Sequence, residues 1–260
     1  MSVDSDWEKD HFVPHRVLLD SEALPLAGSR VVVMGGASGF GLATARGAAH
    51  AGARVTVMSH SADSLAGAAD ELPADVETHA VSALDERALR AAFDRIGDFD
   101  HLVYTAADKP LSGPMTTLPV AQVRRAFETR FFGAVTTVDA AVGHVQRSIT
   151  LTSGAASVRP RSTSGVLASV CGVMEGYMRS LALELAPVRV NLVRPGFTKT
   201  GMWSALDDEA RQALFTRGTD TSLVGHVAEP HEVAHAYLYC MSSTYATGSI
   251  VTVDGGYALV

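Results

Sequence analysis

The feature that most limits what this chain can fold into is an apolar run that stops abruptly at glycines. Residues 31–34 are Val-Val-Val-Met, Gly35 follows, and Gly39 and Gly41 stand just before a helical pattern that begins at Leu42. A β-branched run predicts a buried strand, and glycines permit the tight turn that would join strand to helix. The first turn of such a helix offers free N–H groups and the positive end of a dipole, which suits a phosphate. We therefore expect a nucleotide-binding turn. Its Gly-x-x-x-Gly-x-Gly spacing differs from the usual dinucleotide pattern, and a purely structural turn is the alternative.

Composition narrows the class of protein. With 260 residues, of which 47% are hydrophobic and 19% charged, the chain is long and apolar enough for one α/β domain with a large core. The net charge of -7 argues against nucleic acid as a partner, and two cysteines, Cys171 and Cys240, suggest no disulfide framework. No apolar run is long enough to span a bilayer, and the acidic N-terminus lacks the features of a signal peptide. We expect a cytoplasmic protein with no membrane partner and no metal site.

Strand patterns and helix patterns alternate along most of the chain. After the first strand and helix, strands are predicted at 54–58, 77–81, 100–104, 148–152, 189–193 and 250–253, and helices at 62–72, 85–96, 119–145, 164–185 and from Pro230. This alternation predicts parallel strands joined by right-handed crossovers. Residues 1–28 do not follow the rhythm. They carry enough apolar side chains to favour an arm that packs on its own or a neighbouring subunit, with a loose tail as the alternative, and residues 29–260 form the domain.

Three further stretches, together with the glycine turn, make the chain resemble the short-chain dehydrogenase/reductase family. Residues 191–200 resemble that family's Asn-x-x-x-Pro-Gly-x-x-x-Thr segment, and residues 247–248 with 253–256 resemble its C-terminal signature. Residues 149–153 resemble the strand that ends in the family's catalytic serine. The resemblance implies a doubly wound, seven-stranded parallel sheet in a single Rossmann-fold domain. It also implies a nicotinamide cofactor across the strand ends, a small-molecule substrate, and a homodimer or homotetramer.

The resemblance also assigns the cofactor-binding residues. Those expected around the pyrophosphate and ribose, the adenine, and the carboxamide are Gly35, Ser38, Gly39, Phe40, Gly41, Ala83, Thr105, Ala106, Pro195, Gly196, Phe197 and Thr200. The second strand ends in Ser59, His60 and Ser61, where an enzyme that prefers NAD usually has an acidic residue for the ribose diol. These three side chains could receive a 2′-phosphate instead, so NADP(H) is expected in preference to NAD(H).

The catalytic positions of the family are largely replaced in this chain. Ser153 occupies the serine position, but counting along the sequence places Val166 at the tyrosine, Val170 at the lysine and Arg130 at the asparagine. Without the tyrosine a simple ketone has no proton donor, whereas an iminium ion formed from an imine or a hemiaminal needs none when hydride arrives. Asp108 could stabilise such a cation, or it is a solvated loop carboxylate.

Arg130 argues for a different substrate, because a guanidinium repels a cation and favours a carboxylate or an oxyanion. Ser153, Arg130 and Asp108 are therefore the candidate catalytic residues of an NADPH-dependent reductase with an atypical site. The alternatives are a dinucleotide-binding protein without redox turnover, and a non-redox dehydratase or cyclase.

Several neighbouring residues receive provisional roles. The substrate cleft is expected to include residues 162–164, Met202, Trp203 and a mobile substrate loop at 200–225. Cys171 is interpreted as packing, Tyr177 as core or interface, and Glu175 as an exposed or subunit-interface charge.

Overall fold

The computed structural model describes residues 26–260, and the predicted N-terminal arm lies outside the described residues except for its last three positions. Of those three, Leu26 is buried in the core. Seven parallel strands form one sheet in the order β3-β2-β1-β4-β5-β6-β7. The strands are β1 (Arg30–Met34), β2 (Arg54–Ser59), β3 (Glu77–Ala80), β4 (Phe99–Tyr104), β5 (Val145–Thr152), β6 (Arg189–Pro195) and β7 (Ile250–Val253). The predicted doubly wound parallel sheet is confirmed.

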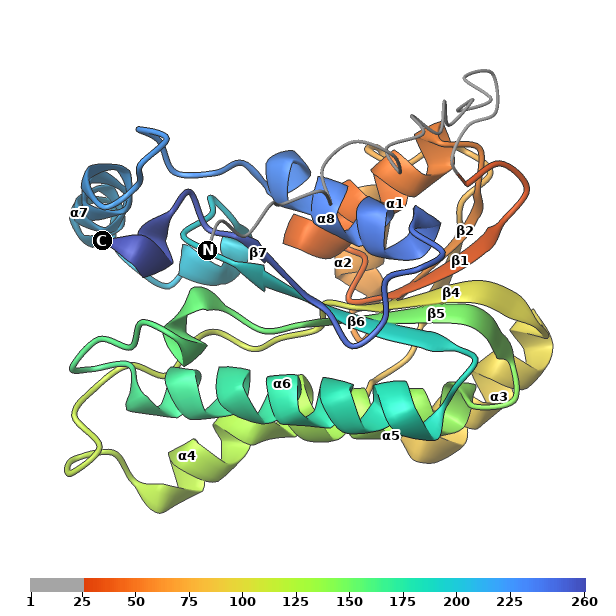
Figure 1. Ribbon diagram of the computed structural model, residues 1–260, viewed down its shortest axis with the longest axis horizontal. Coiled ribbons are helices and arrows are strands. Elements are labelled where there is room, and N and C mark those ends of the chain that lie inside the picture. The colour runs from red at the N-terminus through yellow and green to blue at the C-terminus, as the bar shows by residue number, and fades with distance from the viewer. Residues whose placement is uncertain (1–25) are drawn as a thin grey trace, which may run out of the picture.

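Helices cover both faces of the sheet, as Figure 1 shows. One face carries α1 (Gly39–His50), α2 (Ala62–Ala69) and α8 (Pro230–Ser242), and the other carries α3 (Glu86–Ile96), α5 (Gly133–Ala141) and α6 (Gly165–Glu184). Each layer has its own apolar core: Tyr237 of α8 is fully buried on the first face, and Phe93 of α3 and Met178 of α6 on the second. Asp85 caps α3 as predicted, and Pro230 opens α8 at its first turn.

The long helix predicted at 119–145 is wrong in its continuity and its end. The structure has α4 (Val120–Phe127), a π-helical turn at Glu128–Phe132 and then α5, and residue 145 already begins β5. The apolar stripe of the sequence runs through all three pieces, which is why periodicity alone did not reveal the turn. The hydroxyl of buried Tyr104 donates a hydrogen bond to the carbonyl oxygen of Thr129 within the turn. This bond ties the π-helical turn to the carboxyl end of β4.

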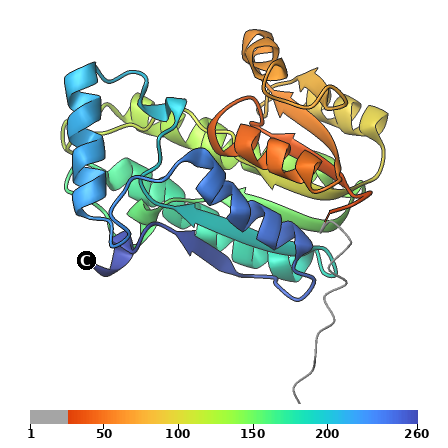
Figure 2. The same ribbon diagram turned by 90° about the horizontal axis from the view of Figure 1, so that it is seen from above.

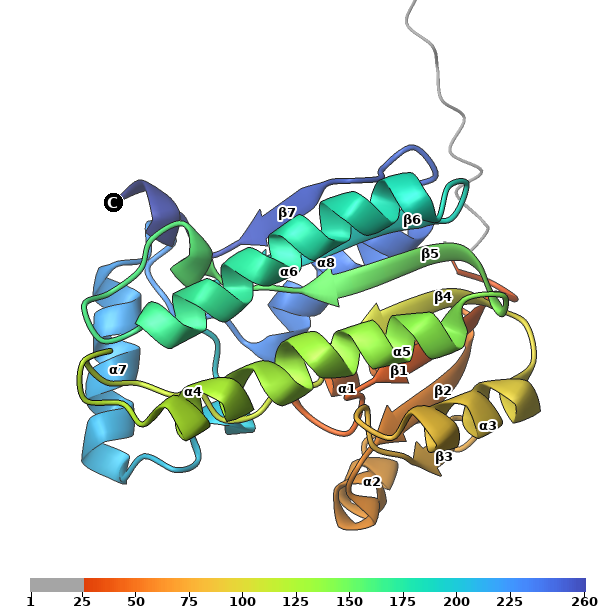
Figure 3. The same cartoon turned by 90° about the horizontal axis from the view of Figure 1, so that it is seen from below.

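Helix α6 corrects the expectation that no segment is long enough to cross a membrane. It has 20 residues and contains an 18-residue window with a mean hydropathy of 1.2, which meets that criterion by length and composition. In the fold it is a core helix that packs beneath β5 and β6, with Met174 and Met178 buried (Figure 3). The core accounts for the apolar side chains on the buried part of this helix, which is 39% of the apolar window.

The segment predicted as a mobile substrate loop at 200–225 contains a helix instead. After a short 3₁₀ turn at Gly201–Trp203, the chain forms α7 (Asp208–Asp220), whose N-cap Asp207 accepts a hydrogen bond from the Ala210 amide. Figure 2 shows α7 standing apart from the sheet, at the end where the strands finish. It is thus placed to cover whatever lies at the carboxyl ends of the strands.

A buried histidine on β4 makes stability depend on pH. His101 is 2% exposed and hydrogen-bonds through Nδ1 to Ser148 Oγ at 2.8 Å. Burial lowers the pKa of His101 from 6.5 to about 4, so the folded state keeps it neutral where the unfolded state would protonate it. Stability from this residue is complete above the unfolded pKa and falls as the pH drops from 6.5 to about 4, in total by about 3 kcal/mol.

We predict that His101→Gln reduces the loss of stability between pH 6.5 and 4, measured by urea unfolding at several pH values. The matched control is His235→Gln, because that histidine is exposed on α8 and its removal should leave the pH dependence unchanged. An unaltered slope in His101→Gln would contradict the assignment.

Candidate active site

The turn between β1 and α1 is packed so closely against the end of β4 that only glycine fits. Gly35 has φ +84, and a Cβ there would lie 2.5 Å from the Ala106 amide nitrogen. A Cβ on Gly41 would overlap the carbonyl oxygen of Gly35. Gly39 has φ +52, a conformation that side chains disfavour. The turn therefore lies against the neighbouring strand at the point where the strand order reverses, which is where open α/β sheets bind ligands.

The first turn of α1 is suited to an anion. Its N-cap, Ser38, makes no side-chain capping bond, and the first turn carries no acidic residue. The amides that normally lack a partner at a helix start are thus available to a ligand.

A crevice of about 400 Å³ runs along this turn. Of the residues that the sequence assigns to the cofactor or to catalysis, it is lined by Gly35, Ser38, Gly39, Phe40, Ser59, His60, Ala83, Thr105, Ala106, Asp108 and Thr200. Five predicted cofactor residues do not line it. Gly41 packs against Gly35, the hydroxyl of Ser61 caps α2 by accepting a hydrogen bond from the Ser64 amide at 3.0 Å, and Pro195, Gly196 and Phe197 line a second cavity instead.

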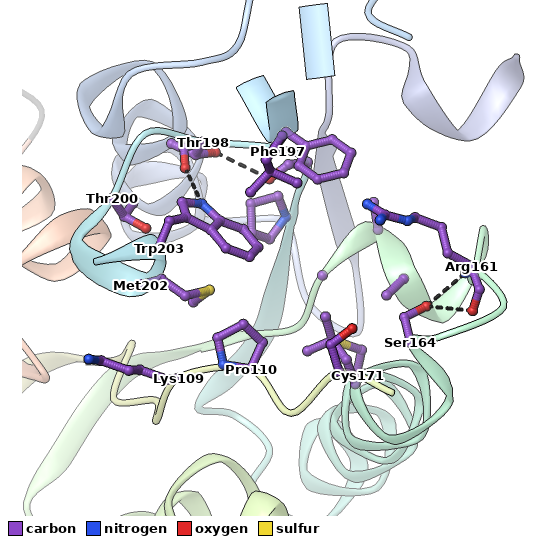
Figure 4. Close-up of a pocket in the computed structure, with 18 of the residues that line it drawn as sticks. Lys109, Pro110, Arg161, Ser164, Cys171, Phe197, Thr198, Thr200, Met202 and Trp203 are labelled. Atoms are coloured by element: carbon purple, nitrogen blue, oxygen red, sulfur yellow. Dashed lines mark hydrogen bonds between the residues drawn. The ribbon is translucent and has the colours of Figure 1, made fainter. Parts of the chain in front are cut away.

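A second, larger cavity of about 530 Å³ adjoins the crevice. Both spaces are lined by Phe40, Lys109, Thr200 and Met202, so they meet at these side chains. The larger cavity holds the predicted Pro195, Gly196 and Phe197 in its wall, together with Thr163, Ser164 and Trp203. Figure 4 shows Phe197 and Trp203 on one side, and Pro110 and Cys171 on the other. Leu206, Leu214 and Arg217 extend the lining to α7 and the segment before it, so this helix forms part of the cavity.

The face that α6 presents to the cavity is shifted by one residue from the sequence prediction. Val166 and Val170 are each 2% exposed in the core and do not line the cavity. Leu167 and Cys171, four residues apart on one helix face, line it instead. The interpretation of Cys171 as packing was therefore incomplete: it is buried, but in the cavity wall. Burial raises the pKa of its thiol.

Ser153 does not line the cavity either, and Gly154 stands in the wall in its place. The Ser153 hydroxyl donates to the Cys171 carbonyl at 2.9 Å and faces the Glu175 carboxylate at 3.3 Å. At Gly154 a Cβ would meet the Cys171 sulfur at 3.1 Å, which shows how tightly this corner is packed.

Arg130 reaches the cavity from the π-helical turn. Its Nη2 lies 3.4 Å from the Asp108 carbonyl oxygen and 3.8 Å from the Met202 sulfur. No carboxylate among residues 26–260 forms an ion pair with it. Burial lowers the pKa of this guanidinium, while Cys171 and Asp108 oppose the shift. The structure brings Arg130 and Asp108 to the junction of the two cavities, but the exposed Asp108 carboxylate belongs to the crevice side.

The interpretation of Glu175 as an exposed or interface charge is wrong, because the residue is 8% exposed and joins three elements. Its Oε1 accepts from Arg194 Nε at 2.9 Å and from Ser157 at 2.5 Å, and Arg194 Nη2 lies 2.8 Å from Oε2. Burial alone would raise the pKa of Glu175, but the hydrogen bonds from Arg194, Ser157 and Ser153 outweigh it and hold the pKa below its usual value. This network fixes the loop that carries Gly154. By contrast, Tyr177 packs edge-on against Phe131, as expected for a core residue.

Comparisons with known proteins agree with this architecture. The family model described as "Enoyl-(Acyl carrier protein) reductase" matches residues 35–258. The short-chain dehydrogenase/reductase ATR9 of Stachybotrys chlorohalonatus is 31% identical over 89% of this chain and 97% of its own length. A solved small-chain dehydrogenase in complex with NADPH is 32% identical with a TM-score of 0.80, over 90% of this chain and all of that one. The structure of MalC reductase/Diels-Alderase from Malbranchea aurantiaca is 28% identical with a TM-score of 0.83, over 91% of this chain and 98% of that one. The chain belongs to the short-chain dehydrogenase/reductase family.

We predict that Glu175→Gln destabilises the protein by about 3 kcal/mol, because it leaves the largely buried Arg194 guanidinium without its counter-charge. Guanidinium chloride unfolding would measure the loss. Glu184→Gln on the exposed end of the same helix is the matched control and should change stability by less than about 0.5 kcal/mol. Equal effects of the two substitutions would contradict a structural role for the network.

Proposed function

We propose that this protein is an NADPH-dependent reductase that transfers hydride to an activated small-molecule acceptor, an imine, iminium or hemiaminal carbon. The observation that carries the proposal is the wall where α6 meets the cavity, in which Leu167 and Cys171 stand where a proton donor would be needed for a simple ketone. The related dehydrogenase solved with NADPH supports the choice of cofactor.

The residues along the crevice fit a dinucleotide phosphate. The free N–H groups at the start of α1 would hold the pyrophosphate against Ser38 and Gly39. At the end of β2 the crevice is lined by Ser59, His60 and Ser64 with no carboxylate, which favours a 2′-phosphate over a ribose diol. When bound, NADPH supplies the hydride.

Apart from the Lys109 ammonium at the junction, the side chains around the reacting end can bind charge but are poorly suited to give up a proton. Arg130 has N–H donors and does not deprotonate in proteins, so it would stabilise negative charge on an oxygen, such as the one that leaves a hemiaminal. The Cys171 thiol has its pKa raised by burial, which makes it a weak acid at neutral pH. Tyr257 lines the larger cavity but not the crevice, and its ring packs edge-on against Phe197. An acceptor that is already cationic at the carbon requires none of these groups to lose a proton.

A cyclisation in the same cavity is the second candidate. The related MalC protein is described as both a reductase and a Diels-Alderase. The cavity of about 530 Å³ here has an apolar lining that would fold a flexible substrate, including Leu111, Leu167, Trp203, Leu206 and Leu214. Product formation without NADPH oxidation would identify this second activity.

Assembly into a homodimer or homotetramer is part of the proposal. Apolar side chains are exposed on the face that carries the π-helical turn and α6, where Phe132 is 53%, Val173 37% and Leu183 84% exposed. Such side chains are typical of a contact between subunits. Sedimentation analysis would measure the assembly.

We predict that the protein oxidises NADPH with 3,4-dihydroisoquinoline but at least about a hundredfold more slowly with the ketone 1-tetralone, because only the ketone needs an acid. Absorbance of NADPH at neutral pH would measure both rates. Gly39→Val is the control for the site, since φ +52 is strained for a branched side chain and the substitution should abolish NADPH binding. Faster turnover of the ketone, or unchanged NADPH affinity in Gly39→Val, would contradict the proposal.

We predict that Leu167→Tyr combined with Cys171→Lys raises ketone reduction by about a hundredfold, because it places a phenol and an ammonium on the cavity face of α6. Turnover of the imine should not rise. The matched pair Val166→Tyr with Val170→Lys should instead lower the melting temperature and give no increase in ketone reduction, since both positions are 2% exposed in the core. A gain in ketone activity from the second pair alone would instead support the sequence-based assignment of residues 166 and 170 to the tyrosine and lysine positions.

A further inference from the structure

The charged residues that line the larger cavity are all of one sign. This charge bears on which substrate the protein reduces, an inference that rests on the proposed function. Its lining includes the cationic residues Lys109, Arg130, Arg159, Arg161 and Arg217 and no aspartate or glutamate. Within residues 26–260, none of the five forms an ion pair with an acidic side chain. The cations are therefore not explained by internal pairing.

Two of these arginines lie against one aromatic pair, and a third, Arg217, lines the same cavity from α7. Phe197 and Tyr257 pack edge-on with ring centroids 5.4 Å apart. The guanidinium of Arg159 lies 4.5 Å from the Tyr257 centroid, and that of Arg161 lies 5.9 Å from the Phe197 centroid. Arg217 immediately precedes Gly218, where a Cβ would be 3.3 Å from Phe197. We call Arg159, Arg161 and Arg217 the arginine cluster.

The cluster lies in the part of the cavity that the crevice does not share. All three residues line the larger cavity and none lines the crevice, whereas Arg130 and Lys109 lie nearer the junction. Figure 4 shows Arg161 reaching inward toward Phe197 from the loop before α6. A substrate whose acceptor carbon lies at the junction would therefore extend its other end toward the cluster.

The side chains of Arg161 and Arg217 are free to bind a ligand. For Arg161, stacking on Phe197 orients the guanidinium without neutralising it or using its N–H donors. Arg159 differs, because its Nη1 donates to the Tyr257 carbonyl oxygen at 2.6 Å. No side-chain hydrogen bond is formed by Arg161 or Arg217 within the described part of the chain. Unpaired guanidinium groups beside apolar walls match a planar carboxylate, which they can bind through two parallel hydrogen bonds.

We propose that the arginine cluster binds a carboxylate on the end of the substrate remote from the hydride acceptor. Such a substrate would be a zwitterion when its acceptor carbon is part of an iminium ion. The carboxylate would offset the repulsion that the cationic lining exerts on the iminium carbon. The cluster thus accounts for how a cavity lined with positive charge accepts a positively charged reacting group.

The test measures binding and needs no turnover. Isothermal titration of the full chain, with and without NADPH, would compare 2-naphthoate with the uncharged 2-naphthamide of the same shape. We expect the carboxylate to bind at least about tenfold more tightly, the difference that charge-assisted hydrogen bonds usually make. Arg161→Gln and Arg217→Gln should each remove most of this preference, and the corresponding lysine variants should retain part of it.

Arg125→Gln is the matched control, because Arg125 is exposed on α4 and lies outside the cavity lining. Thermal melting of each variant would verify that it is folded. Equal affinity for naphthoate and naphthamide, or an unchanged preference in both arginine variants, would overturn the proposal. Tighter binding of 2-naphthyl phosphate than of naphthoate would overturn the carboxylate in favour of a phosphate. Because binding is read directly, a failure of NADPH-dependent imine reduction would leave this result intact, and the two proposals can fail separately.

Discussion

The close approach of the β1–α1 turn to the end of β4 is the constraint on which the site depends. The backbone of Gly35 lies against Ala106, and Gly41 lies against the Gly35 carbonyl, so neither position has room for a side chain. This contact opens the crevice at the reversal of strand order and leaves the N–H groups of α1 facing it. Everything else in the site is arranged around that crevice: β6 and the segment after it close one end, and α6 and α7 enclose the adjoining cavity.

Two polar anchors hold the cavity wall in place without entering it. Tyr104 fixes the π-helical turn through the Thr129 carbonyl, and this turn carries Arg130 to the junction of the two spaces. Glu175 binds Arg194, Ser157 and Ser153, and so fixes the loop beside Gly154. A π-helical turn is a frequent device for aiming a functional side chain. Here it places the Arg130 guanidinium in the cavity to which α6 contributes Leu167 and Cys171.

The sequence was sufficient for the sheet, the crossovers and the glycine turn, because hydrophobic period and turn chemistry are local signals. It placed the α6 face one residue early, because the position came from counting along the sequence from Ser153, and residues 166, 167, 170 and 171 are all apolar and give no signal that separates adjacent faces. Glu175 was misjudged because its partner Arg194 is brought to it only by β6 packing beside α6. The arginine cluster escaped notice for the same reason: a loop and a helix far apart in sequence meet around Phe197.

The proposed reaction requires that hydride reach an acceptor in this cavity without a proton donor from the protein. The most direct measurement is single-turnover reduction of an N-methyl-3,4-dihydroisoquinolinium carboxylate, a permanent iminium that cannot be protonated, in H₂O and in D₂O. We expect stoichiometric NADPH oxidation at the same rate in both solvents. No reduction of this zwitterion, or a rate at least about twofold lower in D₂O from a rate-limiting proton transfer, would contradict it.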